Sequence, residues 1–179
     1  MVNRYGADMG DGTDICAHVG DISLQRAGDE GIGYVIDCVR RSVEASVGED
    51  ERRFSDLWIR DILTISETSL RERRMDDEAY IASDSDGERV GMVWIGASRD
   101  EFTCDATGYL LGIFVEPEYR RKGIGSTLLS FAEDVCKRNG YLHMSLNVGY
   151  ANGSARGFYD SRGYVVRSEV RRKELYRTL

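Results

Sequence analysis

The residue types that are scarce in this sequence already narrow the class of protein to which it can belong. Its 179 residues include only four cysteines, two histidines and one proline. No two cysteines form a C-x-x-C pair, and with so few histidines no zinc or other metal site is expected. The cysteines are Cys16, Cys38, Cys104 and Cys136. A thiol nucleophile stays open as an alternative to idle reduced thiols, although none of the cysteines has an obvious neighbouring base to activate it.

Long apolar runs are also missing. No run approaches the roughly 18 residues that a membrane span needs, and residues 1–20 lack the apolar segment of a secretory signal. We therefore expect a cytoplasmic protein without a membrane partner. Residues 1–20 are predicted to be a mobile tail and residues 21–179 a single domain. A net charge of −7 argues against a nucleic-acid partner, because phosphate backbones are bound by clustered lysine and arginine.

Two familiar phosphate-binding motifs are absent from the stretch that otherwise favours one. Over residues 110–126, an apolar run ends at Pro117, a basic turn follows, and two closely spaced glycines open an amphipathic helix. The P-loop is excluded because the one lysine of the turn precedes Gly123. The dinucleotide fingerprint is excluded because Leu128 stands at its third glycine.

The order of strand, glycine turn and helix still predicts an anion site. Backbone N–H groups in the first turn of a helix have no intrahelical partner, and the helix dipole makes that end positive. Gly123 and Gly125 have no Cβ, so the backbone there can approach a phosphate closely. Arg120, Arg121 and Lys122 add charge at the same turn. The alternative is an ordinary helix start with solvated basic residues.

Two ordered motifs give this region a family resemblance. The pattern Arg-x-x-Gly-x-Gly at residues 120–125 resembles the acyl-CoA pyrophosphate loop of the GCN5-related N-acetyltransferase (GNAT) family. A later segment is similar to another family motif: Asn152, Ala155 three residues on, and Tyr159 four residues after that, followed by Gly-Tyr at 163–164. The resemblance extends over residues 75–170 and is strongest over residues 110–164.

The resemblance implies an α/β (α+β) fold. Its central sheet is mixed and mostly antiparallel, helices flank it, and a splayed strand pair forms the acyl-CoA cleft. Acetyl-CoA is implied as the acyl-donor cosubstrate. The implied cofactor-binding residues are Ile113, Phe114 and Val115 (through their backbone), Arg120, Arg121, Lys122, Gly123, Ile124, Gly125, Ser126, Asn152 and Tyr159.

The same resemblance assigns one catalytic side chain. Tyr159 matches the family tyrosine that protonates the departing CoA thiolate, whereas a helix-face aromatic is the alternative. Asn152 stands where a helix N-cap belongs, so capping alone could explain it. Glu101, Asp105, Glu116 or a water molecule are the candidates for the base that deprotonates the attacking amine.

The implied activity is N-acyl transfer, most simply of acetyl, to a primary amine that attacks the thioester directly in a ternary complex. The acceptor is a small-molecule amine or a peptide or protein amine. Asn147 stands where some relatives that acetylate protein N-termini carry a glutamate base, which weakens that reading. The alternatives are a non-catalytic acyl-CoA sensor and a transferase of larger acyl groups. The chain is predicted to be a monomer or a homodimer.

Apolar periodicity places the elements along the chain. It predicts strands over residues 21–25, 78–83, 90–97, 109–115, 141–148 and 164–170. Helical spacing of apolar residues covers residues 34–43, 55–70, 124–138 and 152–161.

Overall fold

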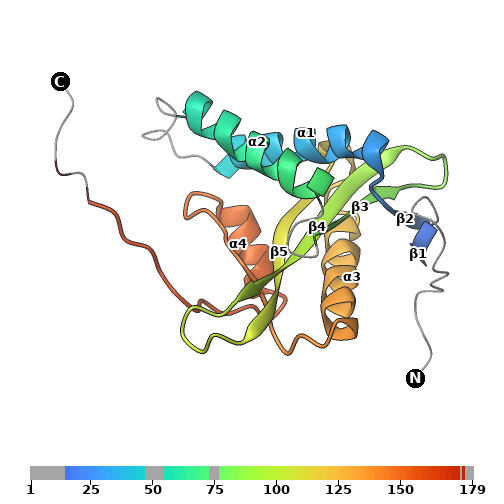
Figure 1. Cartoon of the computed structure of the whole chain (residues 1–179). Coiled ribbons are helices and arrows are strands. Elements are labelled where there is room, and N and C mark those ends of the chain that lie inside the picture. The colour runs from blue at the N-terminus through green and yellow to red at the C-terminus, as the bar shows by residue number, and fades with distance from the viewer. Residues whose placement is uncertain (1–14, 47–54, 73–76, 174, 176–179) are drawn as a thin grey trace.

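Six strands form one sheet in the order in which they follow along the chain (Figure 1). The computed structural model describes residues 15–46, 55–72, 77–173 and 175. The strands are β1 (Ile15–Val19), β2 (Ile22–Arg26), β3 (Glu78–Ser83), β4 (Arg89–Arg99), β5 (Ala106–Val115) and β6 (Met144–Leu146). The helices are α1 (Asp29–Ser46), α2 (Ser55–Glu72), the short 3-10 helix η3 (Pro117–Tyr119), α3 (Ile124–Arg138) and α4 (Gly153–Asp160).

Neighbouring strands run antiparallel from β1 to β5, and only β5 and β6 run parallel. A parallel pair needs a crossover connection, and α3 provides it. The predicted mixed, mostly antiparallel sheet is confirmed.

The parallel strands β5 and β6 separate after three paired residues. β6 pairs with Gly108–Leu110, whereas β5 continues to Val115 with no described strand beside that edge. A bulge coincides with the opening, because Trp94 pairs with Gly112 and Ile95 pairs with Leu110. Leu111 is therefore an extra residue on β5, and such a residue bends its strand. The predicted splayed strand pair is thus present.

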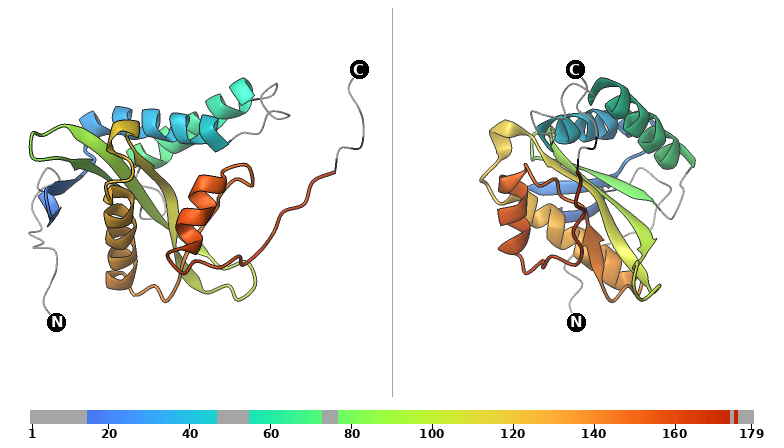
Figure 2. Two further views of the ribbon diagram at one scale, coloured as in Figure 1. Left: turned by 180° about the vertical axis from the view of Figure 1, so that it is seen from behind. Right: turned by 90° about the vertical axis from the view of Figure 1, so that its left-hand side faces the viewer.

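Helices cover both faces of the sheet (Figures 1 and 2). On one face α1 packs against β3, β4 and β5, and α2 packs on α1. The core there includes Val35, Met92 and Phe114. On the other face α3 packs against β4 and β5, and Leu128 and Phe131 are fully buried. None of the helices in the described ranges is long and apolar enough to cross a membrane.

At the N-terminal side the structure moves one boundary. Residues 15–19, which the sequence analysis assigns to the tail, form β1 and pair with β2. Ala17 lies in the core at 1% exposure, so burial of this small apolar residue accounts for the added strand. The rest of the predicted tail, residues 1–14, lies outside the described residues.

At the C-terminal side two predicted strands differ from the structure. The predicted strand at 141–148 is shorter, because pairing of β6 with β5 ends where β5 bulges at Leu111. The predicted strand at 164–170 is wrong for the single chain: this segment has no strand partner and no secondary structure. Its β-branched valines are typical of a strand, but a strand forms only where a neighbouring edge accepts its hydrogen bonds.

Candidate active site

The turn between β5 and α3 exposes the start of a helix. Gly123 is the N-cap residue, with φ of 86°, and no side chain caps the helix there. Arg121 also has a positive φ, 63°. A left-handed residue costs little at glycine but is unfavourable for a side-chain-bearing residue. The strained turn leaves the first N–H groups of α3 without a side-chain acceptor, which is the arrangement that binds anions.

The cations of this turn do not all point the same way. The Nε of Arg120 donates to the carbonyl of Val115 at 2.9 Å, and its guanidinium lies 5.6 Å from the centre of the Phe114 ring. The Nζ of Lys122 lies 4.9 Å from the centre of the Tyr119 ring. Arg120, Arg121 and Lys122 are all exposed. Arg120 therefore joins the end of β5 to the turn while keeping its charge at the surface.

Three elements of the predicted site meet at Gly125. A Cβ placed on this glycine would lie 3.8 Å from Phe158 of α4 and 3.8 Å from Val115 of β5. Ile124 is buried in the core, and Ser126 is half-buried beside it. The structure therefore brings the end of β5, the first turn of α3 and the second predicted motif to one place.

Asn152 is the N-cap of α4, as predicted. Its Oδ1 accepts a hydrogen bond from the Ala155 N–H at 3.1 Å, and its Nδ2 donates to the Ser46 hydroxyl at 3.3 Å. The loop before it also approaches α1, because a Cβ on Gly149 would lie 3.1 Å from the Ser46 carbonyl oxygen. Asn152 thus fixes the start of α4 and ties it to the end of α1.

Tyr159 lies two turns along α4 from Asn152 and is buried, with 9% of its surface exposed. Its ring packs against Phe158 and Tyr164, at centroid distances of 5.4 and 5.7 Å. In the described part of the chain its hydroxyl makes no hydrogen bond. Burial raises the pKa of Tyr159 to about 12, so the side chain carries its proton at neutral pH.

The predicted base Glu116 is engaged in an ion pair. Arg41 of α1 donates to both of its carboxylate oxygens, at 3.0 and 2.7 Å, and the Tyr34 hydroxyl donates at 3.1 Å. Hydrogen bonding to Glu116 raises the pKa of Arg41. Both carboxylate oxygens of Glu116 are therefore engaged by donors from α1. The role of Arg41 was not foreseen, because it lies 75 residues from its partner.

The other two predicted bases, Glu101 and Asp105, are exposed in the turn between β4 and β5. They lie at the opposite end of β5 from Val115, about 30 Å along an extended strand. A carboxylate that the sequence analysis missed lies nearer the bulge. Asp77 is 6% exposed and accepts a hydrogen bond from the Ser69 hydroxyl at 2.5 Å. A Cβ placed on Gly96 would meet both the Asp77 carboxylate and the Leu111 side chain, so Asp77 lies beside the bulge.

The cysteines offer little support for a thiol nucleophile. Cys38 and Cys136 are buried, and burial raises the pKa of each thiol to about 11, so both stay protonated at neutral pH. Cys104 is exposed in the β4–β5 turn, and the side chain of Cys16 lies outside the described residues. Across the described ranges, no grouping of three or more histidine, cysteine or acidic side chains could hold a metal ion.

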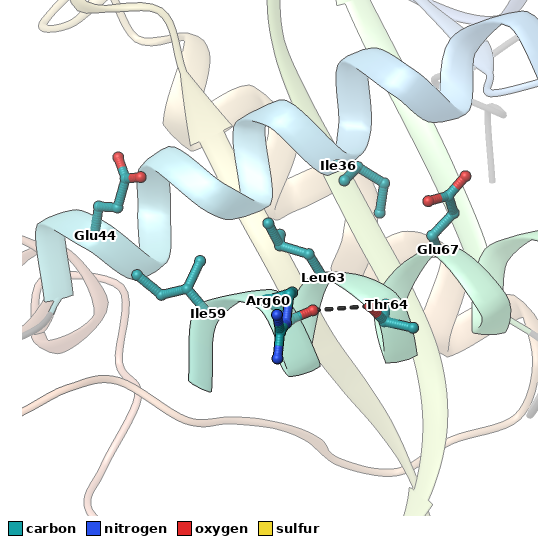
Figure 3. A pocket seen from close by; sticks show the side chains of 7 residues that line it. All are labelled: Ile36, Glu44, Ile59, Arg60, Leu63, Thr64 and Glu67. Carbon is teal, nitrogen blue, oxygen red and sulfur yellow. Dashed lines mark hydrogen bonds between the residues drawn. The ribbon is translucent and has the colours of Figure 1, made fainter. Parts of the chain in front are cut away.

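A separate hollow of about 440 Å³ lies between α1 and α2 (Figure 3). Ile36, Ile59 and Leu63 give it an apolar floor, and Glu44 and Glu67 lie at its rim. Both carboxylates already have partners, Arg40 and Arg71 respectively. The residues that line the hollow include none of the predicted site residues.

Comparison with known proteins agrees with this arrangement. The family model described as "Acetyltransferase (GNAT) family" matches residues 44–164. The chain therefore belongs to the GNAT family, and it is an N-acetyltransferase. Membership implies an acyl-CoA cosubstrate.

The relatives span a range of similarity. The chain is 30% identical over 100 residues to the uncharacterized N-acetyltransferase YhfO of Bacillus subtilis, covering 55% of this chain and 67% of the relative. It is 24% identical over 149 residues to spermidine N(1)-acetyltransferase of Thermoplasma acidophilum, covering 81% and 89%. A solved GCN5-related N-acetyltransferase from Ralstonia eutropha has a TM-score of 0.67 at 16% identity, over 86% of this chain and 98% of that one.

Proposed function

We propose that this protein transfers an acetyl group from acetyl-CoA to a primary amine, by direct attack of the amine in a ternary complex. The observation that carries the proposal is the meeting of three elements at Gly125: the unpaired edge of β5, the uncapped start of α3, and α4 with Tyr159. Together they offer an edge for an extended pantetheine arm, an anion site for the pyrophosphate, and a proton donor.

Different residues would bind different parts of acetyl-CoA. Residues 123–126 would bind the pyrophosphate through backbone N–H groups, with Arg120, Arg121 and Lys122 adding positive charge. Ile113, Phe114 and Val115 would contact the pantetheine arm through their backbone, on the edge that β6 leaves open. The amide of Asn152 already caps α4 and binds Ser46, so its proposed contact with the cofactor uses the remaining Nδ2 hydrogen.

Acetyl-CoA supplies an activated acyl carbon and a thiolate leaving group. The amine nitrogen attacks that carbon, the C–S bond breaks with its electron pair going to sulfur, and Tyr159 donates its hydroxyl proton to the sulfur. A phenol with a pKa of about 12 is a weaker acid than a thiol near 8.5, so full transfer is uphill by roughly 5 kcal/mol. Tyr159 therefore acts in step with bond breaking rather than before it.

The amine must also lose a proton. A typical alkyl ammonium has a pKa near 10.4 and is mostly charged at neutral pH. Because Glu116 is paired and Glu101 and Asp105 lie at the far turn, we propose Asp77, beside the bulge of β5, as the carboxylate that accepts this proton, directly or through water.

Free-thiol release tests the function directly. Purified protein and acetyl-CoA are mixed with spermidine, amino acids, aminoglycosides, lysine peptides and peptides with free N-termini, while CoA is followed colorimetrically. Spermidine is tested first because one relative, which aligns over 81% of this chain and 89% of its own, is named for it. Release with one amine class supports the proposal and names the acceptor. Binding of acetyl-CoA without release of CoA favours the non-catalytic acyl-CoA sensor. Release only with propionyl-CoA or succinyl-CoA favours a transferase of larger acyl groups. If acetyl-CoA does not bind at all, the proposed function is wrong.

A further inference from the structure

The turn that carries the proposed anion site has little apolar anchorage of its own. Of residues 117–123, only Tyr119 is half-buried, and the rest are exposed. Two of these residues, Arg121 and Gly123, have positive φ angles of 63° and 86°. A segment with a strained backbone and little buried surface keeps one shape only where neighbouring groups hold it. Polar contacts must therefore fix the turn.

One such contact comes from α1, which Figure 2 shows beside the turn. Arg41 donates to both carboxylate oxygens of Glu116, the residue just before the turn, at 3.0 and 2.7 Å. Tyr34, two helical turns earlier on α1, donates to the same carboxylate at 3.1 Å. The Glu116 side chain is only 13% exposed, so its charge depends on these donors. An arginine that binds both oxygens of a carboxylate fixes its orientation as well as its charge.

Arg41 also contacts β5 directly. Its guanidinium lies 4.5 Å from the centre of the Phe114 ring, and the guanidinium of Arg120 lies 5.6 Å from the same centre. Phe114 is itself buried, with 7% of its surface exposed. Arg41 therefore contacts the end of β5 at two points, the ring of Phe114 and the carboxylate of Glu116.

The helix that supplies Arg41 is firmly placed. Val35 and Cys38 of α1 are fully buried, and the helix packs against β3, β4 and β5. The end of α1 is joined to the start of α4, because the Nδ2 of Asn152 donates to the Ser46 hydroxyl. Arg41 therefore connects an exposed turn to a helix whose own position is set by the core.

We infer that Arg41 is a positioning residue for CoA binding: through Glu116 it holds residues 117–123 in the shape that presents the first N–H groups of α3 to the pyrophosphate. Arg41 also neutralises a carboxylate that, without a partner, would repel an anion at the same turn. Arg41 lies outside both motifs of the sequence and reaches the site only through packing. The inference rests on the proposed binding of acetyl-CoA at the start of α3.

Calorimetry with CoA tests the pair through two single variants and their double variant. We expect Arg41→Met to raise the Kd for CoA by about tenfold or more, because it leaves the Glu116 carboxylate unpaired beside the phosphate site. Glu116→Gln should raise it less, since Arg41 can still donate to the amide oxygen. The double variant should bind no more weakly than Arg41→Met, because the effects of two residues that act as one pair are not additive.

Arg40→Met is the matched control. It removes the same charge from the next residue of α1, but Arg40 pairs with Asp37 and Glu44 of its own helix. We expect its Kd for CoA to stay within about twofold of the wild-type value, because exposed ion pairs contribute little. A loss in this control as large as in Arg41→Met would assign the effect to net charge and would overturn the inference.

Two other outcomes would also overturn it. Tighter CoA binding by Glu116→Gln than by the wild type would make Arg41 a direct phosphate ligand that Glu116 restrains. A lower melting temperature in Arg41→Met with unchanged CoA affinity would limit the pair to stabilising the fold.

Hydrogen exchange in the CoA-free protein separates this inference from the proposed function. The N–H groups of Tyr119 and Arg120 donate to the carbonyls of Glu116 and Pro117, at 2.9 and 3.3 Å. We expect these two amides to exchange about threefold faster or more in Arg41→Met than in the wild type and in Arg40→Met. Unchanged exchange would contradict the positioning role. Faster exchange in a protein whose wild type does not bind CoA would support the hold on the turn and contradict the proposed function alone.

Discussion

At the scale of single residues, the hydroxyl of Tyr159 is the group whose loss should affect chemistry most directly. We predict that Tyr159→Phe lowers kcat by roughly 10²-fold while acetyl-CoA binding, measured by calorimetry, changes little. The ring and its packing against Phe158 remain, so the variant should fold. Tyr164→Phe is the matched control, because this neighbouring tyrosine hydrogen-bonds Glu133 instead. Wild-type turnover by Tyr159→Phe would remove the residue from the mechanism.

A second prediction at this scale concerns the base. We expect Asp77→Asn to lower kcat/KM by about 10²-fold and to flatten the acidic side of its pH profile, because an amide cannot take up the proton. Asp105→Asn, at the exposed β4–β5 turn, should leave both unchanged. Thermal melting must show that Asp77→Asn still folds, since the carboxylate is buried against Ser69. An unchanged pH profile in this variant would point to water or another group as the base.

At the scale of elements, the start of α3 is the proposed anion site, and Gly125 determines how closely a phosphate can approach it. We predict that Gly125→Val weakens CoA binding at least tenfold in calorimetry, because its side chain fills the space between Phe158, Val115 and the bound phosphate. Gly157→Val is the control: it places the same residue inside α4, where a Cβ meets open space. Equal CoA affinity in the two variants would argue against the phosphate loop.

At the scale of the whole molecule, the buried tyrosines make the stability of the fold depend on pH in the alkaline range. Burial raises the pKa of Tyr159 to about 12, and burial also raises the pKa values of Tyr34 and Tyr164. A raised folded-state pKa means that the unfolded chain ionises first, so stability is intact below about pH 10 and falls as pH rises toward 12.

The expected loss from Tyr159 alone is roughly 2 to 3 kcal/mol in the free energy of unfolding by pH 12. Urea titrations of wild type and Tyr159→Phe at a series of pH values measure it. The wild type should lose stability relative to the variant between pH 10 and 12, because phenylalanine does not titrate. Parallel curves for the two proteins would show that Tyr159 does not titrate differently in the folded state.

Much of the fold could be predicted from local patterns. The bounds of β3 and α3 agree with the sequence to the residue, because turn residues and glycine punctuation mark their ends. The strand at 164–170 could not be predicted correctly, since β-branched valines indicate a tendency to form a strand and not the presence of a partner. β1 was missed because a short strand among polar residues has a weak pattern, and its partner decides it.

The features of the candidate site also divide into those set by local sequence and those set by packing between elements. The sequence by itself determined the glycine turn, its cations, the cap at Asn152 and the tyrosine two turns later, because each depends on residue spacing along one element. Only the tertiary structure decided that Arg41 hydrogen-bonds to Glu116, that Asp77 lies beside the bulge of β5, and that residues 164–173 run away from the sheet. Those facts join residues far apart in the chain, and such contacts are fixed by packing between elements rather than by local pattern.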